Sequence, residues 1–368
     1  MRVKIGVLKE HAKDEKRVIF IPDDIKKISK DYELFVEMGL GEGIGFSDDD
    51  YIKSGAKICT KSEVWKESKI LFKYKSPTKE DYCFFDNNKT LCSLMHPEGD
   101  IELIDNLLLS KMNSFSFEYF KSESGIFPLA YVGGQIAGKM AVYYANHFLQ
   151  SNYGGLGKSL FKVDNTPAPH VMVIGYGNVG GSATRALLDM GCKVTIIGRD
   201  KYKMQKNQVF LNGEIDFLEA TEGNIAYILP KVDAVIGAIL ISTFDTKPII
   251  TKDMMQLMKK GSVIIDVTCG YGAGYLPDLV QKTTLKAPIN TTDSGQIYCK
   301  IDNLPSAYPL TSSIAYSNQI INVLPKIIDY IIFNKNIVLV KNGEITKDGK
   351  IVHSGVASHI LKVREENI

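Results

Sequence analysis

The sequence predicts an α/β protein with two domains, each built on a parallel sheet. Short apolar runs alternate with amphipathic helical segments through most of the chain, and this alternation is typical of parallel sheets flanked by helices. A length of 368 residues is that of two domains of ordinary size. In addition, a glycine-rich motif typical of nucleotide-binding domains begins only at Gly175, so a separate domain precedes it.

The N-terminal part of the chain predicts strands with helices between them. Apolar runs predict the strands, and apolar residues spaced by three and four predict the helices. The expected strands are residues 3–8, 32–39, 69–74, 89–95 and 113–120, and the expected helices are residues 23–30 and 100–112.

The second half of the chain follows a helix over residues 133–150 and a polar, glycine-rich loop. The expected strands there are residues 171–174, 193–197, 233–239 and 262–268, and the expected helices are residues 251–261 and 317–333. The last helix contains Pro325. The polar tail after Phe333 predicts a β-hairpin with turn signals at Asn342-Gly343 and Asp348-Gly349.

The composition excludes several classes of function. A net charge of +2 does not provide the concentrated basic surface that nucleic acid requires. The six cysteines are scattered without a CxxC pair, so we expect reduced thiols and no metal site. The charged N-terminus lacks the apolar core of a signal peptide, and Lys231 and Asp233 interrupt the most apolar window, residues 225–242. We therefore expect a cytoplasmic protein that binds neither nucleic acid nor membrane.

The motif Gly175-x-Gly177-x-x-Gly180 stands between an apolar run and a helical segment, and a second strand follows. In this context Gly175 makes the tight turn, and Gly177 lets the backbone approach a pyrophosphate. Gly180 lets the helix pack closely on the strand, and the positive end of the helix faces the anion. The alternative is an ordinary strand–helix–strand crossover whose glycines only make a turn. The complete context favours binding of a dinucleotide.

The end of the second strand bears on which dinucleotide is bound. An acidic residue about 20 positions past the motif binds the ribose 2′-hydroxyl of NAD, but this chain has Gly198 and Arg199 there. Without the carboxylate a 2′-phosphate is not repelled, and the guanidinium can bind it. We therefore expect NAD or NADP as cofactor, with NADP favoured. The alternatives are Asp200 binding the ribose and a merely solvated Arg199.

Four residues upstream of the motif have catalytic potential. His96 and Lys75 each follow an apolar strand, at the end where α/β proteins bind ligands, and histidine can act as general acid or base near neutral pH. Arg17 precedes an apolar run and can direct its planar fork at a carboxylate. Glu118 lies within the expected aromatic-rich strand. The alternatives are a histidine that caps a turn, a solvated lysine, and a glutamate paired structurally with Arg17 or Lys75.

An ordered set of motifs resembles the alanine dehydrogenase and transhydrogenase family, whose relatives include saccharopine dehydrogenase and N5-(carboxyethyl)ornithine synthase. The motifs are GVLKEHAKDEKRVIFIPDDI, VEMGLGEGIGFSDDDYIKSGAKI, KYKSP, LMHPEGD, GGQIAGKMAV, VIGYGNVGG, DAVIGAILI, MKKGSVIIDV and IYCKIDNLPSAYPLTSS. Together they cover nearly all of the chain up to about Phe333. The order of the whole set is far more specific than any one motif.

The resemblance implies a particular domain arrangement. The family fold has two Rossmann-like domains with parallel sheets separated by a cleft, and the cofactor domain is inserted into a discontinuous substrate domain. On this pattern the substrate domain comprises residues 1–131 and 305–368, and the NAD(P)-binding domain comprises residues 132–304. The family also implies a homo-oligomer, without fixing its size.

The resemblance further assigns roles to individual residues. It implies that Arg17 and Lys75 hold the carboxylate and oxo group of a 2-oxo acid or amino acid, and that His96 is the acid and base. Glu118 and Asn303 are further expected substrate-binding residues, with Asn303 near the nicotinamide. The expected cofactor-binding residues are Gly175, Gly177, Asn178, Val179, Gly180, Gly198, Arg199, Ala238, Ile239, Leu240 and Asp266.

Two features depart from the family pattern. Gly270 occupies the position of an aspartate that helps to order substrate and nicotinamide in alanine dehydrogenases, and the polar tail after Phe333 extends past the usual family end. The leading hypothesis is hydride transfer between a nicotinamide and the Cα of an amino or imino acid, as in reductive amination of a 2-oxo acid or the reverse. The alternative is an opine-type or saccharopine-type enzyme that condenses a 2-oxo acid with lysine or ornithine. A non-catalytic transhydrogenase-like subunit or nucleotide sensor is the alternative of another class.

Overall fold

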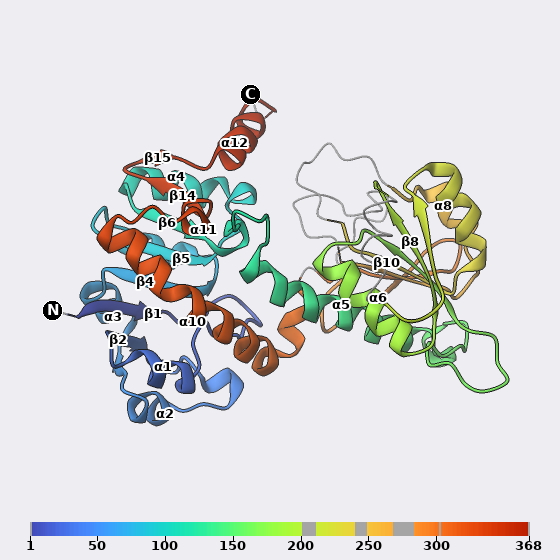
Figure 1. Ribbon diagram of the computed structural model, residues 1–368, viewed down its shortest axis with the longest axis horizontal. Helices are drawn as coiled ribbons and strands as arrows, with labels where there is room; N and C mark the ends of the chain where they lie inside the picture. The colour runs from blue at the N-terminus through green and yellow to red at the C-terminus, as the bar shows by residue number, and fades with distance from the viewer. Residues whose placement is uncertain (1, 201–210, 240–248, 268–282, 302, 367–368) are drawn as a thin grey trace. The chain divides into compact units, whose positions relative to one another are not determined.

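The computed structural model describes residues 2–200, 211–239, 249–267, 283–301 and 303–366, and it divides the chain into two compact units. The first unit combines residues 1–133 with residues 308–368, and the second comprises residues 134–307 (Figure 1). Each unit is built on one largely parallel sheet with helices. The prediction of an α/β protein with two parallel-sheet domains, one inserted into the other, is confirmed.

The sheet of the first unit has eight strands in the order β15-β14-β6-β5-β4-β1-β2-β3. Six of them run parallel, whereas β14 pairs antiparallel with both β6 and β15. The strands are β1 (Val3–Val7), β2 (Tyr32–Glu37), β3 (Lys57–Cys59), β4 (Ile70–Lys75), β5 (Thr90–Leu94), β6 (Asn113–Ser116), β14 (Glu344–Lys347) and β15 (Lys350–Ile351). The C-terminal tail thus supplies two strands at the edge of a sheet that the N-terminus begins.

Helices cover both faces of this sheet. Those described are α1 (Pro22–Ile28), α2 (Asp48–Lys53), α3 (Lys61–Glu67), α4 (Ile101–Ser110), α10 (Pro309–Phe333), α11 (Val338–Lys341) and α12 (Ser354–Glu366). On one face, Trp65 of α3 and Leu107 of α4 share a core with Leu71 and Leu91 of the sheet. On the other face α1 packs against α10, and Ser317 of α10 donates a hydrogen bond of 2.5 Å to the buried Asp24.

The second unit has a seven-stranded sheet in the order β12-β13-β11-β10-β7-β8-β9. Its strands are β7 (His170–Ile174), β8 (Lys193–Gly198), β9 (Ile215–Glu219), β10 (Ala234–Gly237), β11 (Val263–Asp266), β12 (Asn290–Thr291) and β13 (Ile297–Cys299). The helices include α6 (Asn178–Asp189), α8 (Glu222–Ile228), α9 (Lys252–Met255) and the C-terminal part of α5 (Pro128–Phe148), which begins in the first unit. Val171 and Val173 face a core shared with α5 and α6, whereas Met172 and Ile174 face α8 and α9.

Several predicted elements differ from the structure. The helix expected over residues 317–333 begins at Pro309, because a proline at the first helical position is preorganised for the helix. The helix expected over residues 251–261 covers only Lys252–Met255 and ends in turns. Of the two expected hairpin turns, only Asp348-Gly349 connects strands, since Asn342-Gly343 follows the end of α11.

The strand expected over residues 113–120 ends at Ser116. A 3-10 turn, Phe117–Tyr119, follows, so the prediction that Glu118 lies inside a strand was wrong. Phe117 and Phe120 are both fully buried and pack edge to face, with their ring centroids 5.6 Å apart. Residues three apart face the same side of a helical turn but opposite sides of a strand, so burial of both rings requires the turn.

Candidate active site

The sheet order of the first unit places a switch point between β1 and β4. From β1 the chain continues to β2 and β3 on one side of the sheet, whereas β4, β5 and β6 lie on the other side. Side chains beyond the carboxyl ends of strands at such a point face a crevice that binds ligands. The structure brings four predicted residues to this edge: Arg17 after β1, Lys75 at the end of β4, His96 after β5 and Glu118 after β6.

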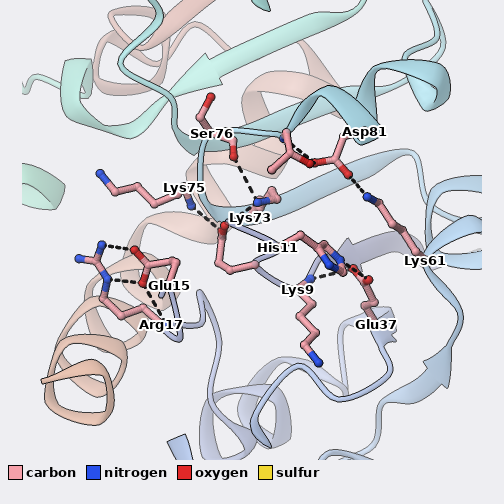
Figure 2. Close-up of polar contacts among 12 residues, drawn as sticks. Lys9, His11, Glu15, Arg17, Glu37, Lys61, Lys73, Lys75, Ser76 and Asp81 are labelled. Atoms are coloured by element: carbon pink, nitrogen blue, oxygen red, sulfur yellow. Dashed lines mark hydrogen bonds and ion pairs between the residues drawn. The ribbon is translucent and has the colours of Figure 1, made fainter. Parts of the chain in front are cut away.

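Arg17 is buried, and Glu15 and Tyr74 hold its guanidinium in place. Nε of Arg17 donates to Oε1 of Glu15 at 2.7 Å and Nη2 donates to Oε2 at 2.5 Å, with both side chains only 4% exposed (Figure 2). This bidentate pairing fixes the plane of the guanidinium. The guanidinium carbon of Arg17, Cζ, also lies 4.4 Å from the centre of the Tyr74 ring, which is a cation–π contact. The sequence pattern predicted Arg17 as a site residue but indicated neither Glu15 nor Tyr74 as its partner.

Lys75 is the last residue of β4 and is half-buried. Its backbone N–H donates to Oε1 of Glu10 at 2.7 Å. Figure 2 shows its side chain extending away from that contact, on the side of the drawing where Arg17 also lies. The side chain therefore leaves the sheet at the carboxyl edge, as the strand pattern predicted.

His96 has a left-handed backbone, with φ 46° and ψ 56°, directly before Pro97. A residue other than glycine pays about 1–3 kcal/mol for such a conformation and keeps it only where its surroundings enforce it. Glu118 provides that constraint, because its Oε1 accepts the backbone N–H of His96 at 2.6 Å and lies 3.5 Å from the imidazole Nδ1. The imidazole does not cap the turn that follows, so the alternative of a capping histidine is wrong.

The charges around His96 act on its protonation. Burial lowers the pKa of the imidazole below 6.5, because it disfavours the charged form. The carboxylates of Glu118 and Glu98 oppose this shift, whereas the positive charges of Lys75 and Arg17 reinforce it. The net effect is an imidazole that stays neutral to lower pH than a free histidine. A neutral imidazole beside two cations can accept a proton from a substrate held there.

Several buried polar atoms near these residues have no hydrogen-bond partner within the part of the chain that the structure describes, and two of them bear on the charges of the site. These two are Oε2 of Glu118 and the hydroxyl of Tyr316 on α10. The Tyr316 ring packs on Tyr74 with centroids 5.1 Å apart, and burial raises the pKa of its hydroxyl well above 10. Buried polar atoms are nearly always paired in native proteins, so each of these oxygens retains the capacity for one more hydrogen bond. Tyr316 was missed because it precedes the helix expected over residues 317–333, which in the structure begins at Pro309.

The second unit has its own switch point, between β7 and β10. Gly175 follows β7 with φ +95°, and an added Cβ there would lie 2.6 Å from the carbonyl oxygen of Ala238. At Gly180 a Cβ would lie 2.0 Å from the carbonyl oxygen of Gly175, whereas at Gly177 it would meet no described atom within 4 Å. The loop is therefore closed except at Gly177. Helix α6 begins directly after Gly177, with Asn178 and Val179 in its first turn, and no side chain caps its N-terminus.

This arrangement fits a dinucleotide pyrophosphate. The first N–H groups of a helix lack intrahelical partners and carry the positive end of its dipole, and the open face at Gly177 gives an anion access to them. The neighbouring strand ends carry the other predicted cofactor residues: Gly198 and the exposed Arg199 after β8, Ala238 and Ile239 after β10, and Asp266 at the end of β11. Leu240 and Gly270 lie outside the described residues.

Asn303, the remaining predicted residue, belongs to the second unit, whereas the other predicted substrate-binding residues belong to the first. Its carbonyl oxygen accepts hydrogen bonds from the backbone and hydroxyl of Ser306 at 2.9 and 2.7 Å, which closes a turn. Among the described residues, no group of three or more His, Cys, Asp or Glu side chains is arranged to hold a metal ion. No described helix has both the length and the apolar character needed to cross a membrane.

Family models match both parts of the chain. The model described as alanine dehydrogenase/PNT, N-terminal domain, matches residues 6–130, and the corresponding C-terminal domain model matches residues 141–354. The second match extends past Phe333, so the prediction that the tail lies beyond the family end was wrong. The tail supplies β14 and β15, which complete the sheet of the first unit.

Individual relatives give the same result. An alanine dehydrogenase of Staphylococcus epidermidis is 30% identical over 318 residues, which cover 86% of this chain and 85% of the relative. Alanine dehydrogenase 2 of Staphylococcus aureus is 29% identical over the same length. Among solved structures, an L-alanine dehydrogenase superposes with a TM-score of 0.87 at 24% identity, covering 98% of this chain and 100% of that one. A transhydrogenase from Sinorhizobium meliloti superposes with a TM-score of 0.78 at 21% identity, covering 95% and 99%.

Proposed function

The chain belongs to the alanine dehydrogenase/PNT family, and from this premise we propose that it is an NAD(P)-dependent oxidoreductase acting on amino and imino acids. Its reaction is reductive amination of a 2-oxo acid or the reverse oxidative deamination. The observation that supports this most directly is the grouping of Arg17, Lys75 and a Glu118-held His96 at one switch point. Cations that bind a carboxylate and an oxo group, together with a neutral acid–base group, are what this chemistry requires.

In this proposal Arg17 and Lys75 receive the substrate. The guanidinium of Arg17, fixed in its plane by Glu15, binds the substrate carboxylate. Lys75 donates to the 2-oxo group, so the carbonyl carbon becomes more electrophilic toward the amine. Fixed donors cost no reorganisation during the reaction, and this is the advantage of a buried arginine over a solvated one.

His96 moves the protons of the reaction. Its neutral imidazole accepts the proton that the amine loses when it attacks, and returns that proton to the hydroxyl that leaves the carbinolamine as water; in the reverse direction it accepts a proton from attacking water. Glu118 holds the backbone of His96 and faces its Nδ1, so it orients the imidazole and stabilises its charged form. In this proposal Glu118 also binds the substrate, through Oε2, which has no hydrogen-bond partner among the described residues.

The glycine motif and the N-terminus of α6 would hold the cofactor pyrophosphate. Arg199 would meet a 2′-phosphate, which is the basis for a preference for NADP. A bound nicotinamide supplies or accepts the hydride at the substrate Cα. In the proposed role Asn303 binds near the nicotinamide and the substrate.

The test is a screen of NADH and NADPH oxidation by the purified chain. It crosses pyruvate, 2-oxoglutarate and larger 2-oxo acids with ammonia, lysine and ornithine. Turnover with ammonia supports the dehydrogenase reaction. Turnover that requires lysine or ornithine instead identifies an opine-type or saccharopine-type enzyme, the alternative raised by Gly270 in place of the family aspartate. Nucleotide binding without turnover in any combination contradicts the proposal and favours a transhydrogenase-like subunit or a sensor.

A further inference from the structure

A buried lysine lies beside the strand end that carries Lys75. The side chain of Lys73 is 0% exposed, and its Nζ donates to Oε2 of Glu10 at 2.5 Å and to the carbonyl oxygen of Ser76 at 3.2 Å. Glu10 is itself buried, in the segment after β1. Its second oxygen, Oε1, accepts the backbone N–H of Lys75 at 2.7 Å. One carboxylate therefore connects the buried lysine with the backbone of the proposed substrate-binding lysine (Figure 2).

The backbone at this point contains a β-bulge. Along β4 and β5 the pairing runs from Phe72 opposite Cys92 to Lys75 opposite Leu94. Three steps on β4 thus match two on β5, so β4 carries one extra residue. In a regular strand Lys73 and Lys75 would lie on the same face. The bulge separates their directions, so that Lys73 enters the interior while Lys75 leaves at the carboxyl edge.

The Lys75 N–H is placed outside the regular ladder by this bulge, and Glu10 accepts its hydrogen bond. At the same time Lys73 joins Glu10 to the Ser76 carbonyl, so the strand end is held on both sides of Lys75. Bulges re-aim side chains next to active sites and need such local support.

We propose that Glu10 is a positioning residue for Lys75: it stabilises the bulge that directs this lysine toward the substrate, with Lys73 as its buried counter-ion. This inference rests on the proposed function, because it takes Lys75 as the group that binds the 2-oxo acid. It assigns to Glu10 no contact with substrate or cofactor.

Single substitutions cannot test this, because removing either partner leaves an unpaired buried charge that destabilises the fold. Two double variants remove the charges together. Glu10→Gln with Lys73→Met keeps an amide oxygen that can accept the Lys75 N–H. Glu10→Ala with Lys73→Met removes the acceptor. The two variants differ at position 10 in the hydrogen-bond acceptor and in side-chain volume, so unchanged nucleotide affinity serves as the control for the cavity that alanine leaves.

The expected result is a split between the two double variants. The Gln variant should retain a KM for the 2-oxo acid within about threefold of the parent chain, whereas the Ala variant should raise it about tenfold or more, as for loss of one orienting hydrogen bond. Nucleotide affinity, measured by fluorescence titration, should be the same in both. Equal KM values in the two variants would overturn the proposal.

A second measurement needs no variant and no turnover. Hydrogen exchange at the Lys75 amide of the unmodified chain should be slow despite the bulge, because its N–H is bonded to a buried carboxylate. Fast exchange would overturn the inference even if both double variants failed to fold. Slow exchange in a chain without oxidoreductase turnover would show that the proposed function had failed while the Glu10–Lys75 contact held.

Discussion

The carboxylate of Glu15, two residues before Arg17 in the sequence, occupies one edge of the Arg17 guanidinium. Glu15 pairs with Arg17 in a segment that is neither helix nor strand. Periodicity predicts contacts only within regular elements, so this pair could not be found from the sequence. The same holds for the contact of Glu118 with the backbone of His96, which depends on a turn expected to be a strand. The sequence therefore predicted the chemical groups of the proposed site, whereas the residues that hold them in place could be found only in the folded chain.

The lowered pKa of His96 leads to a prediction on pH dependence. Oxidative deamination needs the neutral imidazole as base, and a pKa below 6.5 keeps it neutral to lower pH. The acid limb that His96 contributes to the pH profile of kcat/KM for amino-acid oxidation should therefore lie below pH 6.5. Glu118→Gln removes a charge that raises the pKa, so this limb should move to still lower pH.

His96→Ala serves as the control for that profile. It should abolish turnover while leaving nucleotide binding intact, because His96 belongs to the other unit of the chain. An acid limb above pH 6.5 would contradict the lowered pKa of His96. A limb that moves to higher pH in the Glu118→Gln variant would contradict the assigned effect of the Glu118 charge. Turnover that His96→Ala leaves unchanged would remove His96 from the mechanism.

Arg199 supports a prediction on cofactor choice. Its side chain is exposed after β8, and a charge-assisted bond to a 2′-phosphate is worth about 1.5–3 kcal/mol. Arg199→Ala should therefore lower the NADPH-to-NADH ratio of kcat/KM by about tenfold or more. Arg185→Ala, at an exposed position of α6, is the matched control and should leave the ratio unchanged. If Arg199→Ala also leaves it unchanged, the preference for NADP is wrong.

At the scale of elements, strands were predicted best where they are buried on both sides. The central strands β7, β10 and β11 are nearly continuous apolar runs in the sequence, as parallel strands covered by helices should be. In β1, β4 and β5 only single polar residues interrupt the apolar run. Four of the described strands were missed: β3, β12 and β13 have only two or three residues, and β9 is partly exposed. Their pairing comes from the neighbouring strand rather than from their own composition.

The junction of β7 and α6 yields a prediction with a built-in control. Gly180→Ala would place a Cβ 2.0 Å from the Gly175 carbonyl oxygen, so the start of the helix must move away from the loop. We expect NADPH affinity to fall at least about tenfold, since pyrophosphate binding depends on this geometry. Gly181→Ala, one residue on, meets its nearest atom at an ordinary 3.9 Å. It should keep nucleotide affinity and raise thermal stability slightly, by up to about 1 kcal/mol of helix propensity. Equal affinities in fluorescence titration would contradict this view of the loop.

At the scale of the whole molecule, each unit buries a core of its own. The two units should therefore unfold in separate calorimetric transitions. A ligand stabilises only the part that binds it, by about 2.7 kcal/mol at a hundredfold excess over Kd. NADPH should shift the transition of residues 134–307 and leave that of the other unit in place. In the Gly180→Ala variant the shift should be reduced. A uniform shift of both transitions would show that the nucleotide does not act on one unit alone.

The long-range pairing of β14 with β6 also has a consequence for how the chain is made. The hydroxyls of Ser114 and Thr346 lie 2.7 Å apart across this pair, although 232 positions separate them in sequence. While the ribosome synthesises the intervening residues, the edge of β6 has no partner strand, and an open edge is a template for aggregation. The inserted unit is continuous and can fold as soon as it emerges. Nascent chains and C-terminal truncations that stop before Glu344 should therefore depend on chaperones that shield this edge.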